Sequence, residues 1–232
     1  MSGPNKVQHM PPSAGPRCLQ SDARIDEADL AGANICETDV LVIGGGGAGC
    51  AAALEASRSG AKVTLGDQAA ASGDSNTVMA EGGIQASVEK GDTPQMHFDD
   101  TLKGGHHYVD RELAAQMVLD GPEVIRWLIQ QGMQFDLDKY GELLTRRAGG
   151  TSAPRVVYYR DYTGLEMMRV LREAVSNSPV EVRDYNPAVE LLSNEHGECA
   201  GAVLSSPEEL PLHRGETKAG DPRQRRYRPY AP

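Results

Sequence analysis

The sequence predicts an α/β fold built on a parallel sheet, and the order of its apolar segments supports this prediction. A run at residues 38–43, rich in β-branched side chains and apolar from Val40 to Ile43, precedes a glycine cluster and the alanine-rich stretch 50–58, which is a good helix sequence. Gly60 is expected to end this helix, and a second strand is expected at 61–65. Strand, helix and strand in this order form a βαβ unit with parallel strands, so we expect the first run to be buried on both faces.

The rest of the chain predicts one long connection, further helices and several short strands. Residues 66–110 are rich in Gly, Ser and Asp with little periodicity, so we expect a long functional loop there. Apolar positions from Arg111 to Gln131 fit either one amphipathic helix or two that are separated near Gly121-Pro122. A further helix is expected from Thr163 or Gly164 to about Ser176. Short strands are expected at 180–183, 189–192 and 200–204.

Composition and charge disfavour several classes of protein. Hydrophobic residues make up 39% and charged residues 24% of the 232 residues, which is enough apolar material to fold around a core. The formal net charge of −10 disfavours nucleic acid as a partner, because like charges repel. No run approaches the roughly 18 apolar residues of a membrane helix, so we expect a cytoplasmic protein without membrane insertion. The four cysteines are scattered, which predicts neither a metal site nor a disulfide framework.

Composition also divides the chain into three parts. Residues 1–36 are expected to form a flexible leader, because they combine several prolines with small polar residues. Residues 37–205 carry the predicted domain. Residues 206–232 hold six basic and four acidic residues among many prolines, unlike the acidic remainder of the chain. We expect this tail to be either a frameshifted reading of the coding sequence or a disordered basic extension.

The glycine cluster has the spacing of a dinucleotide-binding turn. Residues 44–49 satisfy G-x-G-x-x-G between the predicted strand and helix: the first Gly permits a tight turn, the second a close pyrophosphate, and the third close helix–strand packing. The pyrophosphate is then bound by N–H groups at the positive end of the helix dipole. Asp67 follows at about the spacing, roughly 20 residues, at which an acid binds ribose hydroxyls. The motif indicates a Rossmann-like site but leaves FAD and NAD both open.

The segment after the second strand resembles that of a particular family. Residues 72–84 are similar to the stretch that wraps the flavin and pyrophosphate of FAD in the flavoprotein subunits of succinate dehydrogenase and fumarate reductase, and in L-aspartate oxidase. The resemblance covers about residues 38–204 and implies the N-terminal part of a Rossmann-like FAD-binding domain, without the family's capping domain and C-terminal helical domain. Four further motifs match this family in order and spacing: His97–Gly104, Pro122–Leu128, Gly149–Ser152 and Asp161–Gly164.

The resemblance implies FAD as the cofactor and a set of residues that bind it. Asn76 occupies the place at which many members attach the flavin covalently through a His, so we expect non-covalent FAD. Gly66 stands where the family usually keeps a large apolar residue, and Asp67 where a Glu is more usual, so the adenosine end is expected to bind somewhat more weakly. The implied cofactor-binding residues are Gly44, Gly45, Gly46, Gly47, Ala48, Gly49, Asp67, Gln68, Ser72, Gly73, Ser75, Asn76, Thr77, Ala80, Glu81, Gly82, Gly83 and Ala188.

The reaction that the resemblance implies is hydride exchange between a small dicarboxylate and the flavin, as in fumarate reductase and succinate dehydrogenase. The family's dicarboxylate-binding residues come after the segment matched here, so we assign no catalytic residue and expect this chain alone to be inactive. Structural or surface roles are expected for the remaining His and Arg candidates: His97, His106, His107, Arg146, Arg147, Arg155 and Arg160.

Several alternatives stay open beside this interpretation. L-aspartate oxidase chemistry is the nearest, and a fragment that binds FAD without catalysis is another. An NAD-linked Rossmann dehydrogenase is disfavoured, because its second strand is normally followed by a shorter connection. The resemblance also implies a partner that carries iron–sulfur clusters for electron transfer, which would place the chain at the cytoplasmic face of a membrane.

Overall fold

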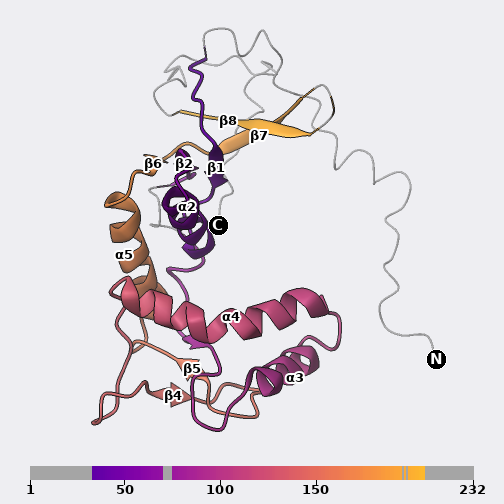
Figure 1. Cartoon of the computed structure of the whole chain (residues 1–232), viewed down its shortest axis with the longest axis vertical. Helices are drawn as coiled ribbons and strands as arrows, with labels where there is room; N and C mark the ends of the chain where they lie inside the picture. Colours follow the sequence, from indigo (N-terminus) through magenta and orange to yellow (C-terminus); the bar gives the residue numbers. More distant parts are fainter. Residues whose placement is uncertain (1–32, 70–74, 195, 197, 207–232) are drawn as a thin grey trace, which may run out of the picture.

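A computed structural model describes residues 33–69, 75–194, 196 and 198–206 of the chain. The tail expected beyond residue 206, and nearly all of the expected leader, lie outside this part. A small parallel sheet and a two-stranded hairpin lie at one end of the molecule, and two neighbouring helices and a second small sheet lie at the other (Figure 1). A long helix, α5 (Thr163–Ser176), runs between these two ends.

The predicted βαβ unit is present. Strand β1 (Val40–Ile43) leads through helix α2 (Gly47–Arg58) to strand β2 (Val63–Gly66), which pairs with β1 in parallel. Strand β6 (Glu181–Arg183) pairs in parallel with the other side of β2, so the sheet order is β1-β2-β6. The central strand, β2, is buried along its whole length.

The expectation that the first strand is buried on both faces is wrong. Strand β1 is only half-buried, and the side chain of its last residue, Ile43, is 51% exposed. The reason is its place at the edge of the sheet: within the described residues, β1 has a neighbouring strand on one side only. The continuous apolar run predicted the strand correctly but could not show which strands flank it.

Helix α2 packs against strands β1 and β2 and against helix α5, and residues of α2, β2 and α5 together form the main core. Both helices occur where the sequence predicts them, and Gly60 follows α2 with a φ of +89°, a conformation that favours glycine. The core is made of small side chains from α2 and larger ones from β2 and α5. It includes Cys50, Ala53, Leu54, Val63, Leu65, Met168, Leu171 and Val175.

The prediction of a long irregular loop at 66–110 is wrong for its second half. Helix α3 (Pro94–Gly104) lies within it, after a short strand β3 (Ile84–Gln85). Thr93 caps this helix by accepting a hydrogen bond from the Met96 N–H at 3.2 Å. Thr followed by Pro is a helix-start signal. The loop was predicted instead because the residues around this signal are mostly polar and show little periodicity.

Helix α4 (Arg111–Gln130) is a single helix, which decides between the two alternatives left open by the sequence. Asp110 caps it through two backbone N–H groups, each 3.0 Å from its side-chain oxygen. Pro122 lies inside the helix without ending it. Val118 and Ile125 are buried on either side of that proline, and this packing offsets the backbone hydrogen bond that a proline cannot donate.

Two more sheets complete the fold. Strand β5 (Val156–Val157) pairs with β3 and with β4 (Thr145–Arg146) in a small antiparallel sheet that the sequence did not predict. Strands β7 (Ala188–Ser193) and β8 (Cys199–Leu204) lie where the sequence predicts strands, and they form an antiparallel hairpin whose register pairs Ala188 with Leu204. Among the helices of the described part, none is long and apolar enough to cross a membrane.

Candidate functional site

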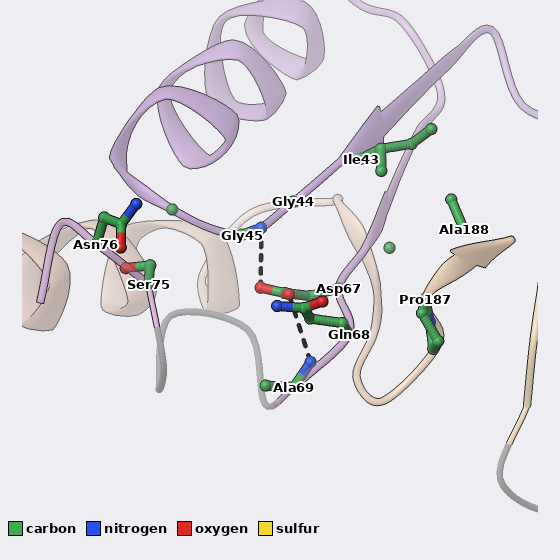
Figure 2. A pocket seen from close by; sticks show the side chains of 12 residues that line it. Ile43, Gly44, Gly45, Asp67, Gln68, Ala69, Ser75, Asn76, Pro187 and Ala188 are labelled. Carbon is green, nitrogen blue, oxygen red and sulfur yellow. Dashed lines mark hydrogen bonds between the residues drawn. The ribbon is translucent and has the colours of Figure 1, made fainter. Parts of the chain in front are cut away.

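A cleft of about 340 Å³ opens at the carboxyl ends of β1 and β2, the edge at which open α/β sheets bind their ligands. Four segments contribute to it: the glycine turn after β1, the residues after β2, residues 75 and 76, and the start of β7 (Figure 2). Among the described residues that line it, Asp67 alone is ionisable. The lining residues are Ile43, Gly44, Gly45, Gly46, Gly66, Asp67, Gln68, Ala69, Ser75, Asn76, Pro187 and Ala188.

The glycine turn can be made only by glycines at its two ends. Gly44 has a φ of +100°, which side-chain-bearing residues rarely adopt. A Cβ on Gly49 would lie 1.8 Å from the carbonyl oxygen of Gly44, so any larger residue would force the helix away from the strand. The tight turn and the close helix–strand packing expected of the first and last glycines are therefore both present.

The start of α2 is suited to bind an anion. Its N-cap residue, Gly46, offers no side-chain cap, and the first turn contains no acidic residue. The N–H groups of a first helical turn have no partner within the helix and lie at the positive end of its dipole. Of these, the Gly47 N–H donates to Thr77 Oγ1 at 3.2 Å. Because Gly46 lines the cleft, this positive helix end faces it.

Asp67 is fixed in the cleft by backbone groups on both sides. Its Oδ2 accepts the N–H of Gly45 at 2.9 Å, and its Oδ1 accepts the N–H of Ala69 at 3.4 Å (Figure 2). The acid predicted at the end of the second strand therefore lies directly against the glycine turn. Each carboxylate oxygen keeps a further lone pair with which to accept a hydroxyl.

Cys50 lies beneath the same turn and is not a reactive thiol. Its side chain is 1% exposed, and its Sγ donates to the carbonyl oxygen of Gly45 at 3.3 Å. Burial, with a contribution from the Asp67 charge, raises the pKa of the Cys50 thiol to about 11. The thiol is therefore neutral at ordinary pH, and Cys50 is part of the core.

The connection after β2 contacts the glycine turn at one end and helix α5 at the other. A Cβ on Gly46 would lie 3.4 Å from the Ser75 Cβ, and one on Gly47 would lie 3.2 Å from Thr77 Cγ2. Further along, the Gly164 N–H donates to the Ala80 carbonyl at 2.7 Å. The start of α5 therefore shapes residues 75–83, the segment that the sequence assigns to the cofactor.

Arg146 contacts the last part of this segment. Its guanidinium donates to the carbonyl oxygen of Gly82 at 2.8 Å and lies over the ring of Tyr158, 4.4 Å from the centroid. Both contacts are those of a residue that stabilises a loop conformation.

The predicted cofactor residues fall into four groups. Residues 47–49 form the first turn of α2, next to the cleft, while Thr77, Ala80, Glu81, Gly82 and Gly83 continue from the cleft toward α5 and β3. Ser72 and Gly73 lie outside the described residues. The predicted residues that the structure brings together in the cleft lining are Gly44, Gly45, Gly46, Asp67, Gln68, Ser75, Asn76 and Ala188.

Four lining residues were not predicted: Ile43, Gly66, Ala69 and Pro187. Ile43 and Gly66 are the last residues of their strands, and the carboxyl-edge rule for parallel sheets would have selected them. Pro187 precedes the predicted Ala188 directly. Ala69 carries no signal in the sequence, because it is held through its backbone N–H and carbonyl groups.

Arg155, one of the His and Arg candidates, has a structural role. Its guanidinium is fully buried and donates to both carboxylate oxygens of Asp92, at 2.8 and 2.9 Å, and to Asp100 Oδ2 at 2.7 Å. Asp100 also accepts the Ser152 N–H at 2.7 Å, and its pKa is lowered by these hydrogen bonds against the opposing effect of burial. This ion cluster joins α3 to the turn before β5, away from the cleft.

His97 lies near the ion cluster, and the remaining candidates are not buried. His97 is 5% exposed, its Nδ1 has no hydrogen-bond partner among the described residues, and burial and the Arg155 charge lower its pKa. None of the candidates lines the cleft: His106, His107, Arg147 and Arg160 are exposed. Within the described ranges, no cluster of His, Cys, Asp and Glu has the arrangement of a metal site.

Comparison with protein families finds one match across most of the chain. A family model described as "FAD binding domain" matches residues 39–228. Among curated proteins, L-aspartate oxidase of Streptomyces coelicolor is 35% identical over 167 residues, which is 72% of this chain and 29% of that protein. A CoM/CoB fumarate reductase chain of Methanothermobacter marburgensis is 37% identical over 170 residues, 72% of this chain and 31% of that protein. The chain thus spans about a third of the length of these relatives.

Comparison with solved structures finds similar chains in proteins of the same kind. The Mycobacterium smegmatis Sdh1 complex contains a chain that is 32% identical, with a TM-score of 0.67 over 71% of this chain and 30% of that one. The FrdA chain of a mutant Escherichia coli quinol fumarate reductase is 27% identical, with a TM-score of 0.66 over 68% of this chain and 27% of that one. The fold described above is therefore shared with known proteins of similar sequence.

Proposed function

The chain belongs to the FAD binding domain family of the fumarate reductase, succinate dehydrogenase and L-aspartate oxidase flavoproteins, and from this premise we propose that its cleft binds the adenosine and pyrophosphate of non-covalent FAD. The observation that carries the proposal is the contact between the turn and Asp67. An acid and a helix N-terminus without acidic residues lie together at one cleft, and they match the ribose hydroxyls and the pyrophosphate of an adenine dinucleotide.

The pyrophosphate would be bound by the first turn of α2. Gly46 lines the cleft and carries no side chain, so a phosphate oxygen could approach the backbone of this turn, where the Gly47 N–H is shared with Thr77 Oγ1. The charge of the pyrophosphate would be stabilised by the helix dipole, and no acidic side chain in that turn opposes it. Within this proposal, Ala48 and Gly49 contribute backbone and packing rather than side chains.

The ribose would be bound by Asp67. Its carboxylate is already oriented by the N–H groups of Gly45 and Ala69, so binding requires little reordering of this side chain. An Asp reaches less far than a Glu, which is why the sequence predicts somewhat weaker adenosine binding. Gln68 and Ala188 lie in the lining of the same cleft and would complete the adenosine end.

The flavin would lie along residues 75–83. The Asn76 carboxamide cannot form the bond to flavin that a His forms in many members, so the cofactor would be released on denaturation. Thr77 contacts the glycine turn, while Ala80, Glu81 and Gly82 have their carbonyls bound by Gly164, Thr163 and Arg146. Ser72, Gly73 and Gly83 belong to the same proposal.

The reaction is proposed from the family as a whole. Bound FAD would supply hydride exchange with the carbon of a small dicarboxylate, as the fumarate reductase name of the Methanothermobacter relative suggests. The described residues contribute cofactor binding, and we place no catalytic residue among them. L-aspartate oxidase chemistry is the second candidate, because a relative of that name matches this chain at 35% identity. An electron-transfer partner with iron–sulfur clusters, and a location at the cytoplasmic side of a membrane, belong to the same proposal.

Titration of the purified 232-residue chain with FAD tests the proposal. We expect quenching of flavin fluorescence that saturates, competition by ADP but not by FMN, and complete release of the flavin after acid precipitation. Folded chain without saturable FAD binding would contradict the function, and flavin retained in the pellet would contradict non-covalent attachment.

A matched pair of glycine variants sharpens this test. In Gly49→Ala the new Cβ meets the Gly44 carbonyl, whereas in Gly104→Ala, at the end of α3, it meets nothing within 4 Å. We expect the first variant to lose FAD binding and the second to bind FAD like the unchanged chain.

A further inference from the structure

Leu204 occupies the space above the end of β2 that a side chain at Gly66 would need. Gly66 is buried, and a Cβ built on it would lie 3.2 Å from Leu204 Cδ1 and 3.4 Å from Leu204 Cδ2. The carbonyl oxygen of Asn186 is also close, at 3.5 Å. Contacts this tight mean that any side chain at residue 66 would displace Leu204 or the backbone near it.

The position of Leu204 determines the position of one wall of the cleft. In the β7–β8 hairpin, Leu204 is the direct partner of Ala188, and the Ser205 N–H donates to the Pro187 carbonyl at 2.9 Å. Pro187 and Ala188 both line the cleft, on the side away from residues 75 and 76 (Figure 2). A shift of Leu204 would therefore move this wall.

The segment that precedes the wall is bonded to the residues that follow β2. The Asp67 N–H donates to the Arg183 carbonyl at 3.0 Å, and the Asn186 N–H donates to the Asp67 carbonyl at 2.7 Å. The Tyr185 N–H donates to the Ala69 carbonyl at 3.0 Å. The wall is thus tied to Asp67 through its backbone and packed on Gly66 through Leu204.

We propose that Gly66 and Leu204 form a size-matched pair that sets the width of the cleft at its adenosine end, which makes Gly66 a specificity-determining position for the ADP half of the cofactor. This inference rests on the proposed FAD function of the cleft. Leu204 supplies from β8 the apolar volume that β2 does not supply at this point, so Gly66 does not leave a void beside the adenosine.

A volume exchange between the two positions tests the pair. Gly66→Val adds to β2 the same number of carbon atoms that Leu204→Ala removes from β8. We expect Gly66→Val in the full chain to weaken ADP binding by about tenfold, because overpacking displaces the wall. The double variant should recover ADP affinity to within about threefold of the unchanged chain, measured by isothermal calorimetry alongside the unfolding temperature.

Gly201→Ala is the matched control, because it lies in the same hairpin but does not line the cleft. A Cβ there would lie 3.7 Å from Leu192 Cδ1, an ordinary contact, so ADP affinity should be unchanged. Unchanged ADP affinity in a folded Gly66→Val chain would contradict the proposal that Gly66 and Leu204 are matched in size. A double variant that binds ADP more weakly than either single variant would contradict it as well.

If Gly66→Val does not fold, Leu204→Ala alone decides the question. A severalfold loss of ADP affinity in that variant supports the inference, and unchanged affinity contradicts it. An unchanged chain that is folded but binds neither ADP nor FAD would overturn the proposed function and this inference together. Binding by the unchanged chain with no effect of either substitution would overturn the inference alone.

Discussion

The backbone N–H of Gly164 donates to the carbonyl oxygen of Ala80 at 2.7 Å, so the first turn of α5 binds the segment assigned to the flavin. A Cβ on Gly164 would lie 1.8 Å from the Thr77 carbonyl oxygen and 2.7 Å from that of Ala80. Only glycine permits this approach. The Thr163 hydroxyl, which donates to the Glu81 carbonyl at 3.4 Å, adds a second contact from the same turn.

Substitution of Gly164 by Ala should therefore disturb the flavin segment more than the adenosine cleft. We expect Gly164→Ala to weaken FAD binding by more than tenfold while ADP binding changes by less than about threefold, since overpacking of this kind costs about 1–3 kcal/mol. Parallel titrations with FAD and ADP measure the difference. Gly121→Ala, where the new Cβ meets Ala86 at 3.5 Å, is the control and should leave both affinities unchanged.

Removal of the Arg155 side chain should strongly destabilise the fold. Arg155→Met leaves Asp92, whose side chain is 1% exposed, and Asp100 without their shared cation, and an uncompensated buried charge costs about 3–5 kcal/mol. Urea denaturation measures this as a fall in the free energy of unfolding. Arg58→Ala removes an exposed ion pair with Glu55 and should cost no more than about 1 kcal/mol. Equal effects of the two substitutions would contradict the structural role of Arg155.

The sequence predicted the parts of the fold that depend on local pattern. Helix α2 was predicted from its alanine-rich run and α5 from its apolar spacing, and Gly44 and Gly49 were identified by motif spacing before their geometry was known. Strands β3, β4 and β5 were missed, because two-residue strands carry no measurable alternation and pair only after distant segments meet. Helix α3 was missed although Thr93 and Pro94 mark its start.

The candidate site, like the fold, could be predicted from the sequence only in part. Asp67 was predicted by its distance from the glycine turn, since the motif itself defines that spacing. The contact of Gly66 with Leu204 could not be predicted, because it depends on how the β7–β8 hairpin packs against the parallel sheet. Local spacing therefore predicts the glycine turn and Asp67 in the cleft, whereas the packing of its opposite wall on Gly66 depends on tertiary structure.

His97 should make the stability of the protein fall as the pH falls below about 6.5. Burial, and secondarily the Arg155 charge, lower its pKa in the folded chain, whereas in the unfolded chain it titrates near its ordinary value. Below that value the unfolded chain takes up the proton first, so stability that is complete at higher pH is lost as the pH falls toward the folded pKa. Urea denaturation at several pH values measures this slope.

Substitution of His97 isolates its contribution to that slope. His97→Gln should flatten the fall in stability below about pH 6.5, since no proton is then taken up at this position. His106→Gln, at an exposed position, should keep the slope of the unchanged chain. An unchanged slope in His97→Gln would show that another group causes the pH dependence.

Cys50 should be protected from alkylation mainly by its burial and partly by the negative charge of Asp67. Its pKa of about 11 leaves almost no thiolate at pH 8, and thiolate is the reactive form, whereas Cys36 and Cys199 are exposed. We expect mass spectrometry after brief iodoacetamide treatment at pH 8 to find Cys36 and Cys199 modified and Cys50 unmodified.

Asp67→Asn, which removes the negative charge while keeping an oxygen for the Gly45 N–H, should lower the Cys50 pKa and speed its alkylation at pH 10. Because the same charge is proposed to bind the ribose, this variant should also weaken ADP binding by about fivefold, the difference between a charged and a neutral hydrogen bond. Loss of ADP affinity without faster Cys50 alkylation would show that burial alone protects the thiol.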